Sequence, residues 1–168
     1  MLKGQWKLEF LSGGPALPSS TVMNELGSWT NLDNDAVRNF SGLAKYTIQF
    51  NKPSGEAASY LLNLGKVNET AEVLLNGKWI ATLIGPSYTT LIPATALQST
   101  NKLEIVVANL MANRIAYMDR NSMAWKIFYN TNMPARKAEN LKDGLFSAAH
   151  WKPLPSGLSG PVSLTPLK

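Results

Sequence analysis

The sequence predicts an all-β fold, an antiparallel β-sandwich or jelly roll, on three observations. About eight short segments of alternating apolar and polar residues recur along the chain, separated by turn residues. Asn76-Gly77 lies between apolar runs at 71–75 and 79–83, and this dipeptide is typical of a two-residue hairpin turn because both positions need positive φ. A length of 168 residues, 45% of them hydrophobic, predicts one packed domain over residues 1–168.

The first half of the chain carries three further expected strands. Alternation places the first strand at residues 6–10, with every second side chain facing the core. Residues 16–39 are rich in Pro, Ser, Asn and Gly, which predicts a long loop with one short helical turn. Strands are then expected at 44–50, with one face toward water, and at 60–64.

The strands after the hairpin are expected at residues 88–92, 102–108 and 160–166. Trp6 and Trp79 both fall in strand patterns, so we expect both rings in the core. No repeat with the period of a solenoid or a propeller is present. Together these strands make a two-layer sheet stack the expected architecture.

A long irregular insert near residues 110–157 interrupts this pattern. Residues 111–119 and 122–129 are expected to form short helical or irregular segments. Three prolines rule out a continuous sheet strand there: Pro134, Pro153 and Pro155.

Charge and composition argue against several classes of protein. The formal charge is +5, but the basic residues are scattered, and Arg136-Lys137 is the densest pair, so a nucleic-acid surface is not expected. No apolar run approaches the ~20 residues of a membrane span, so no membrane partner is expected. The absence of cysteine excludes disulfides and thiolate metal sites.

The order of these segments resembles the galactose-binding-like β-sandwich domains attached to glycoside hydrolases. Three motifs carry the likeness: Phe40 to Tyr46, Leu64 to Val67 with Ala71 to Lys78, and Asn101 to Asn109. They are similar to the sugar-binding domain of glycoside hydrolase family 2, in which a hairpin with an Asn-Gly-Lys turn follows a strand of this kind. Asn113-Arg114 and residues 156–162 are closer to the C-terminal domain of family 106 α-L-rhamnosidases.

The resemblance implies an accessory domain that works beside a catalytic domain of a parent hydrolase, outside the cytoplasm, in the periplasm or secreted. In family 2 enzymes the loop after the strand that ends at Asn109 can approach the active site of the neighbouring domain, which implies a role at a domain interface. The insert between Asp119 and His150 has no counterpart in this resemblance. Sandwiches of this kind often carry a structural Ca²⁺, although no spaced acidic motif marks one here, and no other cofactor is expected.

No catalytic constellation is evident, so the chain is not expected to be an enzyme. Glycoside hydrolysis needs two carboxylates roughly 5–9.5 Å apart. Asp33 with Asp35, or Asp119 with a distant partner, could converge, but the acids otherwise fall on polar strand faces, in turns and in loops. His150 is the only histidine, and no Gly-x-Ser-x-Gly elbow accompanies it, so neither a catalytic triad nor a transition-metal site is expected.

A sugar site needs an aromatic platform and planar polar side chains in fixed positions. The candidate residues lie in loops expected at one end of the sandwich: Trp29, Asn109, Asn113, Arg114, Trp125, Tyr129, His150 and Trp151. Each also has a structural interpretation. Trp and Tyr often close the end of a small sandwich, Asn109 can tie down a turn, and Arg114 can pin the insert through bidentate bonds.

Two functions are expected ahead of a third, a small enzyme that uses loop acids, which two carboxylates facing each other across a cleft would favour. The first is a non-catalytic carbohydrate-binding or accessory domain of a larger glycoside hydrolase. The second is a structural or protein-interaction module without a sugar site, whose insert docks against a partner domain. Exposed, coplanar rings in a groove would favour the first function, and buried rings the second.

Overall fold

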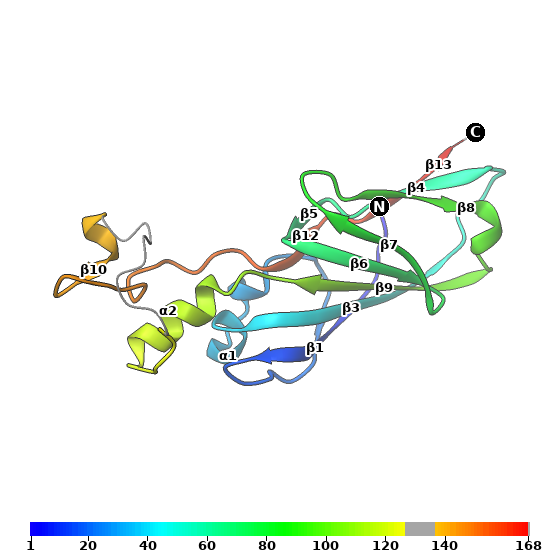
Figure 1. Ribbon diagram of the computed structural model, residues 1–168. Helices are drawn as coiled ribbons and strands as arrows, with labels where there is room; N and C mark the ends of the chain where they lie inside the picture. The colour runs from blue at the N-terminus through cyan, green and yellow to red at the C-terminus, as the bar shows by residue number, and fades with distance from the viewer. Residues whose placement is uncertain (127–136, 168) are drawn as a thin grey trace.

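The computed structural model describes residues 1–126 and 137–167 of the chain. They form two layers of antiparallel strands, so the predicted all-β sandwich is confirmed (Figure 1). The larger layer is a six-stranded sheet in the order β2-β1-β3-β9-β6-β7. In that order the strands span Thr21–Met23, Trp6–Gly14, Ser41–Asn51, Thr100–Ala108, Thr70–Leu75 and Lys78–Ile84.

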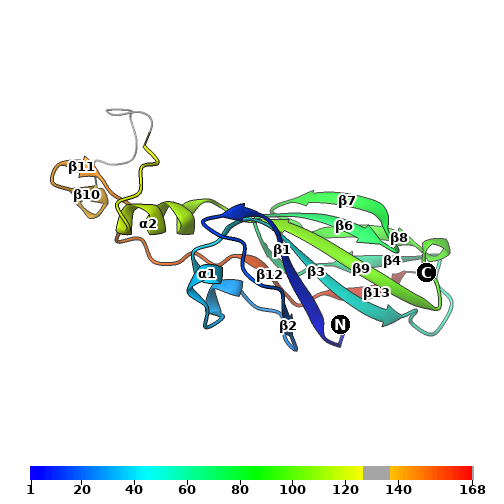
Figure 2. The same cartoon turned by 90° about the horizontal axis from the view of Figure 1, so that it is seen from below.

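The second layer combines a three-stranded sheet in the order β13-β4-β8 with the pair β12-β5. Their bounds are Ser163–Leu167, Ser59–Asn63, Thr89–Pro93, Gly157–Gly160 and Lys66–Asn68. Figure 2 shows this layer covering one face of the larger sheet. The last strands of the chain therefore complete the layer that strands from the middle of the chain begin.

The predicted hairpin is present as β6 and β7. Asn76 and Gly77 form its turn with φ angles of 52° and 79°. The Asn76 side chain also accepts a hydrogen bond from the Lys102 N–H at 2.9 Å, which ties the turn to β9. The turn residues are therefore held both by their own backbone preference and by the neighbouring strand.

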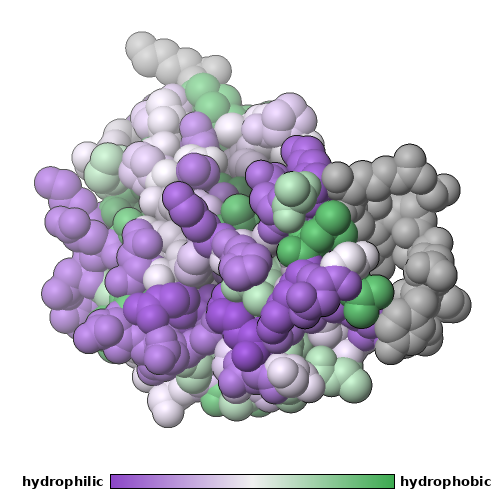
Figure 3. All heavy atoms as spheres, turned by 90° about the vertical axis from the view of Figure 1, so that its left-hand side faces the viewer, coloured by the Kyte–Doolittle hydropathy of each residue, from purple (hydrophilic) through white to green (hydrophobic). Residues whose placement is uncertain are grey.

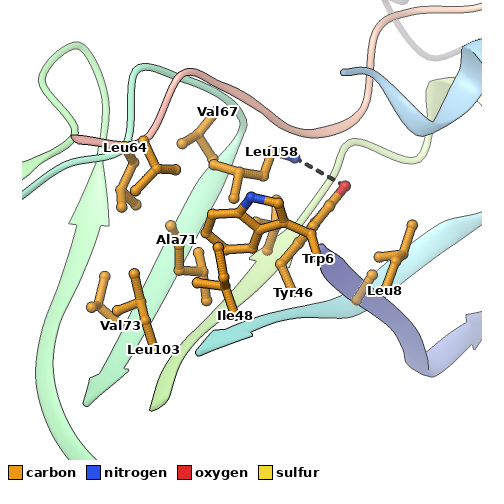
Figure 4. Packing of buried hydrophobic residues seen from close by; sticks show 14 of the residues in the cluster. Trp6, Leu8, Tyr46, Ile48, Leu64, Val67, Ala71, Val73, Leu103 and Leu158 are labelled. Atoms are coloured by element: carbon orange, nitrogen blue, oxygen red, sulfur yellow. Dashed lines mark hydrogen bonds between the residues drawn. The ribbon is translucent and has the colours of Figure 1, made fainter. Parts of the chain in front are cut away.

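The core lies between the two layers and consists of the inward-facing residues of both (Figure 4). Buried and outward-facing residues alternate along the strands as the sequence predicted. Tyr46, Ile48 and Ile105 are buried, while their strand neighbours face outward. Each fully buried Leu or Ile side chain contributes about 1.5–3 kcal/mol to folding. The Tyr46 hydroxyl accepts a hydrogen bond from the Leu158 N–H at 3.1 Å, and burial raises the pKa of Tyr46 well above its ordinary value.

The expected core position of Trp79 is wrong, because its side chain is 60% exposed. The register between β6 and β7 shifts between Val73, which pairs with Ala81, and Leu74, which pairs with Trp79. The extra residue, Ile80, forms a β-bulge, and one extra residue turns the preceding side chains to the other face of the sheet. Trp6, by contrast, is 2% exposed and lies in the core as predicted.

The loop at residues 16–39 contains more regular structure than expected. It holds strand β2, a 3₁₀ turn at Trp29–Asn31 and the helix α1 at Asp35–Arg38. The Asn34 side chain caps α1 by accepting hydrogen bonds from the N–H groups of Ala36 and Val37. A further 3₁₀ turn, Ala94–Ala96, follows β8.

The predicted insert leaves the sandwich as a projection, which we call the arm and define as the described residues 110–126 and 137–155. The helix α2 (Ala112–Arg120) leads away from the sheets, and β10 (Leu141–Lys142) and β11 (Leu145–Phe146) lie beyond its far end (Figure 1, Figure 2). A 3₁₀ turn at Ala138–Asn140 precedes β10. The chain then returns to the sandwich at β12.

Candidate functional site

Asn109 joins the arm to the sandwich. Its side-chain oxygen accepts a hydrogen bond from the Gly42 N–H at 2.9 Å, and its amide nitrogen donates to the Phe40 carbonyl at 3.1 Å and to Ser156 Oγ at 3.0 Å. The outgoing and returning ends of the arm are therefore fastened to the start of β3 through one amide. This is the turn-tying role that the sequence offered as the alternative to sugar binding.

Asn113, in the first turn of α2, holds the returning chain in a similar way. Its amide nitrogen donates to the Leu154 carbonyl at 2.9 Å, and its oxygen accepts from the Leu154 N–H at 2.8 Å. The residue is 5% exposed. Both hydrogen-bonding groups of the side chain are thus engaged with backbone, which leaves little capacity for a sugar hydroxyl.

Trp29 is a core residue and not part of an open platform. Its exposed fraction is 0%, and its ring makes edge contacts with Phe10 and Phe40 at centroid distances of 5.6 and 5.9 Å. Its backbone N–H donates to the Ser156 carbonyl at 3.1 Å. No face of this ring is open to a ligand, which corrects the expectation that Trp29 contributes to a sugar site.

Asp119, near the end of α2, organises the far part of the arm. Its carboxylate accepts hydrogen bonds from Trp125 Nε1 at 2.5 Å and from the Ala148 N–H at 2.6 Å, and it lies 3.3 Å from Lys126 Nζ. Burial alone would raise the pKa of Asp119, but these hydrogen bonds and the Lys126 charge outweigh burial and lower it. The sequence indicated Asp119 as a loop acid that could converge with a distant partner, and the distant group that it meets is the Ala148 N–H, 29 residues away.

The aromatic rings of the arm form a cluster around Phe146. Trp125 and Trp151 each meet Phe146 edge-to-face, with interplanar angles of 76° and 78°. Trp151 Nε1 donates to the Asn140 side chain at 2.9 Å, and Lys126 Nζ lies 5.4 Å from the Trp125 ring centroid. The rings are half-buried and not coplanar, so they do not form the flat platform that the first function predicts.

A hollow of about 370 Å³ lies beside this cluster. Its wall includes Trp125, Lys126, Lys142, Asp143 and Phe146. Figure 3 views the molecule from the end that carries the arm and shows mainly polar side chains with apolar ones among them. The lining of the hollow therefore combines the aromatic rings of Trp125 and Phe146 with basic and acidic side chains.

The remaining predicted residues lie apart from this cluster or outside the described chain. His150 is exposed on the returning segment. Arg114 makes no hydrogen bond or ion pair with the residues the structure describes, so the expected bidentate pinning of the insert is wrong. Tyr129 lies outside the described residues.

The structure brings Trp125 and Trp151 together, and it adds residues that the sequence did not single out. Lys126, Asn140 and Phe146 complete the aromatic cluster, and Ser28 and Ser156 complete the attachment of the arm. Ser156 contacts Ser28, Asn109 and Asn113, which lie 128, 47 and 43 residues away in the sequence, so no local pattern marks it. Only the proximity of Lys126 to Trp125 in the sequence could have indicated a partner.

Three further properties of the described residues bear on function: metal-binding groups, the pKa values of the acids and the length of the helices. Within residues 1–126 and 137–167, no group of three His, Cys, Asp or Glu residues could hold a metal ion. Glu9, hydrogen-bonded by Lys7, and Asp119 have lowered pKa values, the opposite of what a general acid requires. Among the helices described, none has the length and apolar character needed to cross a membrane.

The chain is similar in sequence and structure to short segments of much longer proteins. A protein of Formosa agariphila named "Putative beta-glucuronidase" is 31% identical, in an alignment that covers 99% of this chain and 16% of that protein. The rhamnosidase structure from Novosphingobium sp. PP1Y matches 97% of this chain with a TM-score of 0.74 and 31% identity, over 14% of its own length. The chain resembles one segment of large glycoside hydrolases. The sequence-based resemblance is confirmed at this level, and no protein-family profile matches the chain.

The match to the rhamnosidase is more extensive than the match to solved β-glucuronidases. The Bifidobacterium dentium β-glucuronidase is 23% identical and covers 64% of this chain with a TM-score of 0.51, which shows a shared fold alone. The match to the rhamnosidase covers 97% of this chain, so it extends into the insert, for which the sequence-based resemblance offered no counterpart. The chain spans 14% to 16% of the length of the first two relatives.

Proposed function

We propose that this chain is a non-catalytic accessory domain of a larger glycoside hydrolase, located outside the cytoplasm with its parent enzyme. One observation carries the proposal: nearly the whole chain matches only a small segment of two long relatives, at 31% identity in both. The lowered pKa values of Glu9 and Asp119, and the use of Asp119 to hold the arm together, support a non-catalytic role.

The arm is the part of the chain best suited to contact the rest of such an enzyme. It projects from the sandwich and is fastened at its base by Asn109 and Asn113 (Figure 1). Exposed apolar side chains distributed over an element that projects from a globular body are typical of a protein interface. Six large apolar side chains of the arm are exposed: Leu110, Met111, Met123, Leu141, Leu145 and Leu154.

Hydrogen–deuterium exchange tests this role. Exchange would be measured on the isolated chain and on the full hydrolase polypeptide that contains it. We expect amides of α2 and residues 141–154 to exchange more slowly in the full polypeptide, because a partner domain covers them. Strand β9, which is paired on both sides within the six-stranded sheet, serves as the internal reference and should exchange equally in both. Equal exchange of the arm in both samples would contradict a docking role.

Carbohydrate binding is the second candidate function, and the hollow beside Trp125 is the observation that favours it. Charged side chains beside aromatic rings can bind a sugar through hydrogen bonds even without a flat platform. Replacing Trp125 or Trp151 by Ala should then weaken glycan binding in a titration while the sandwich stays folded. Unchanged binding in the Trp125→Ala protein would exclude this hollow as the sugar site.

A further inference from the structure

The Arg114 side chain lies at the base of the arm, against the larger sheet. Its guanidinium packs against Gly14, the last residue of β1: a Cβ atom at Gly14 would lie 2.8 Å from Cζ of Arg114 and 3.0 Å from each terminal nitrogen. A side chain at residue 14 would displace the guanidinium from this position. The contact joins the first turn of α2 to the end of β1 in the larger sheet.

This guanidinium has no anionic partner within the described chain. Its Nε is buried and makes no hydrogen bond, and its two terminal nitrogens, also unbonded, are not buried. The other two arginines that the structure describes differ, since Arg38 pairs with Asp35 and Arg120 donates to Asn39 at 2.9 Å. Arg114 is thus partly desolvated and oriented without the carboxylate that would compensate the cost.

We infer that Arg114 is the receptor for an Asp or Glu side chain of the domain that covers the arm. The inference rests on the proposed accessory function and names the contact that anchors it. A planar, preoriented guanidinium with two free nitrogens matches a carboxylate in bidentate geometry. The flanking residues Leu110 and Met111 are each 52% exposed, and Arg beside apolar side chains is typical of the energetic centre of a protein interface. A sugar carboxylate would also need a ring face nearby, and Trp29 is buried.

The site can be tested on the isolated chain with sodium acetate as the probe for a carboxylate side chain. The ¹H–¹⁵N signal of Arg114 Nε would be followed by NMR during titration at constant ionic strength, with Arg120 as the matched internal control. We expect a saturable shift at Arg114 with an apparent affinity about tenfold above that of Arg120, because the fork is preoriented. A shift no larger than that of Arg120 would overturn the inference.

Two variants separate orientation from charge. Arg114→Lys keeps the charge and loses the fork, and we expect the affinity for acetate, measured by isothermal or NMR titration, to fall about tenfold. Gly14→Ala displaces the guanidinium while leaving Arg114 in place, and we expect a loss of similar size. Acetate binding unchanged in both variants would contradict the inference.

The same titration with sodium glucuronate distinguishes the source of the carboxylate. Similar affinity for acetate and glucuronate supports a protein carboxylate. Glucuronate bound more than about tenfold tighter would overturn the inference in favour of a sugar ligand. Because the arm's exchange protection in the full polypeptide is measured separately, protection without acetate binding at Arg114 would refute this contact and leave the accessory function standing.

Discussion

Asn76 and Gly77 give the sharpest test at the scale of single residues. Gly77 has a φ of 79°, and no atom lies within 4 Å of the position a Cβ would take, so the cost of a side chain there is conformational and not steric contact with the rest of the protein. We expect Gly77→Val to lower the free energy of unfolding by about 1–2 kcal/mol, because a β-branched residue is strained at positive φ.

Urea unfolding of the wild type, Gly77→Val and Gly77→Asn measures this effect. Asn tolerates the left-handed region, so the Gly77→Asn protein should lose less stability than the Gly77→Val protein. A Gly77→Val protein as stable as the wild type would contradict the turn conformation.

Tryptophans show where sequence reasoning succeeded and failed at this scale. Trp6 follows strict alternation and lies in the core, whereas the bulge at Ile80 turns Trp79 outward. A bulge inserts one residue without changing the composition of a strand, so the alternation of β7 gave no sign of it. Trp29 was open to either interpretation, and its burial depends on Phe10 and Phe40, which the sequence could not place beside it.

Among the structural elements, the arm is the one whose attachment makes a direct prediction. Its two ends meet at the base, where Asn109 Nδ2 and Ser156 Oγ lie 3.0 Å apart. Replacing residues 110–155 by a short Gly-Ser turn should therefore leave the sandwich folded, with a Tm within about 5 °C of the wild type. Circular dichroism with a thermal scan measures this, and loss of the cooperative transition would show that the arm is part of the folding unit.

Asp119 makes the internal order of the arm dependent on pH. Its pKa is lowered from 3.8 in the folded state, so the stabilisation it provides is present above its unfolded pKa and is lost as pH falls through the lower folded pKa. We expect the fluorescence of Trp125 and Trp151 to change in this acid range, below about pH 4, as the arm loosens. The fluorescence change should disappear in Asp119→Asn.

Glu9 supplies the control for this titration. Its pKa is also lowered, chiefly by the hydrogen bond from Lys7, but it lies on the outer face of the larger sheet. Glu9→Gln should therefore leave the pH dependence of the arm's fluorescence intact. A change that persists in Asp119→Asn and vanishes in Glu9→Gln would refute the assignment to Asp119.

For whole elements, the sheets were predictable and the arm was not. Strands such as β3 and β9 show clear alternation because one face meets the core and the other meets water. The arm has no such two-sided environment, and its order depends on pairs such as Asp119 with Ala148 and Asn113 with Leu154, which are 29 and 41 residues apart. Only the helical character of residues 112–120 could be expected from local sequence.

At the scale of the whole molecule, the structure is a stable platform with a projecting element. The six-stranded sheet and the second layer enclose one continuous core, which gives the arm a rigid base. Asn109, Asn113 and Arg114 all lie at that base. The side chains of Asn109 and Asn113 form hydrogen bonds that attach the arm there. Arg114 makes no hydrogen bond or ion pair in the described chain, so its guanidinium is available to a partner domain that contacts the base of the arm.

A hydrolysis assay with the purified chain tests the central claim most directly. The chain would be incubated with 4-nitrophenyl α-L-rhamnoside and 4-nitrophenyl β-D-glucuronide, the substrate types suggested by its longer relatives. We predict that nitrophenol release does not exceed the rate in buffer, because the chain corresponds to a small segment of those enzymes and its organised acid, Asp119, is engaged in holding the arm. Release above the buffer rate that is abolished by Asp119→Asn would contradict the account.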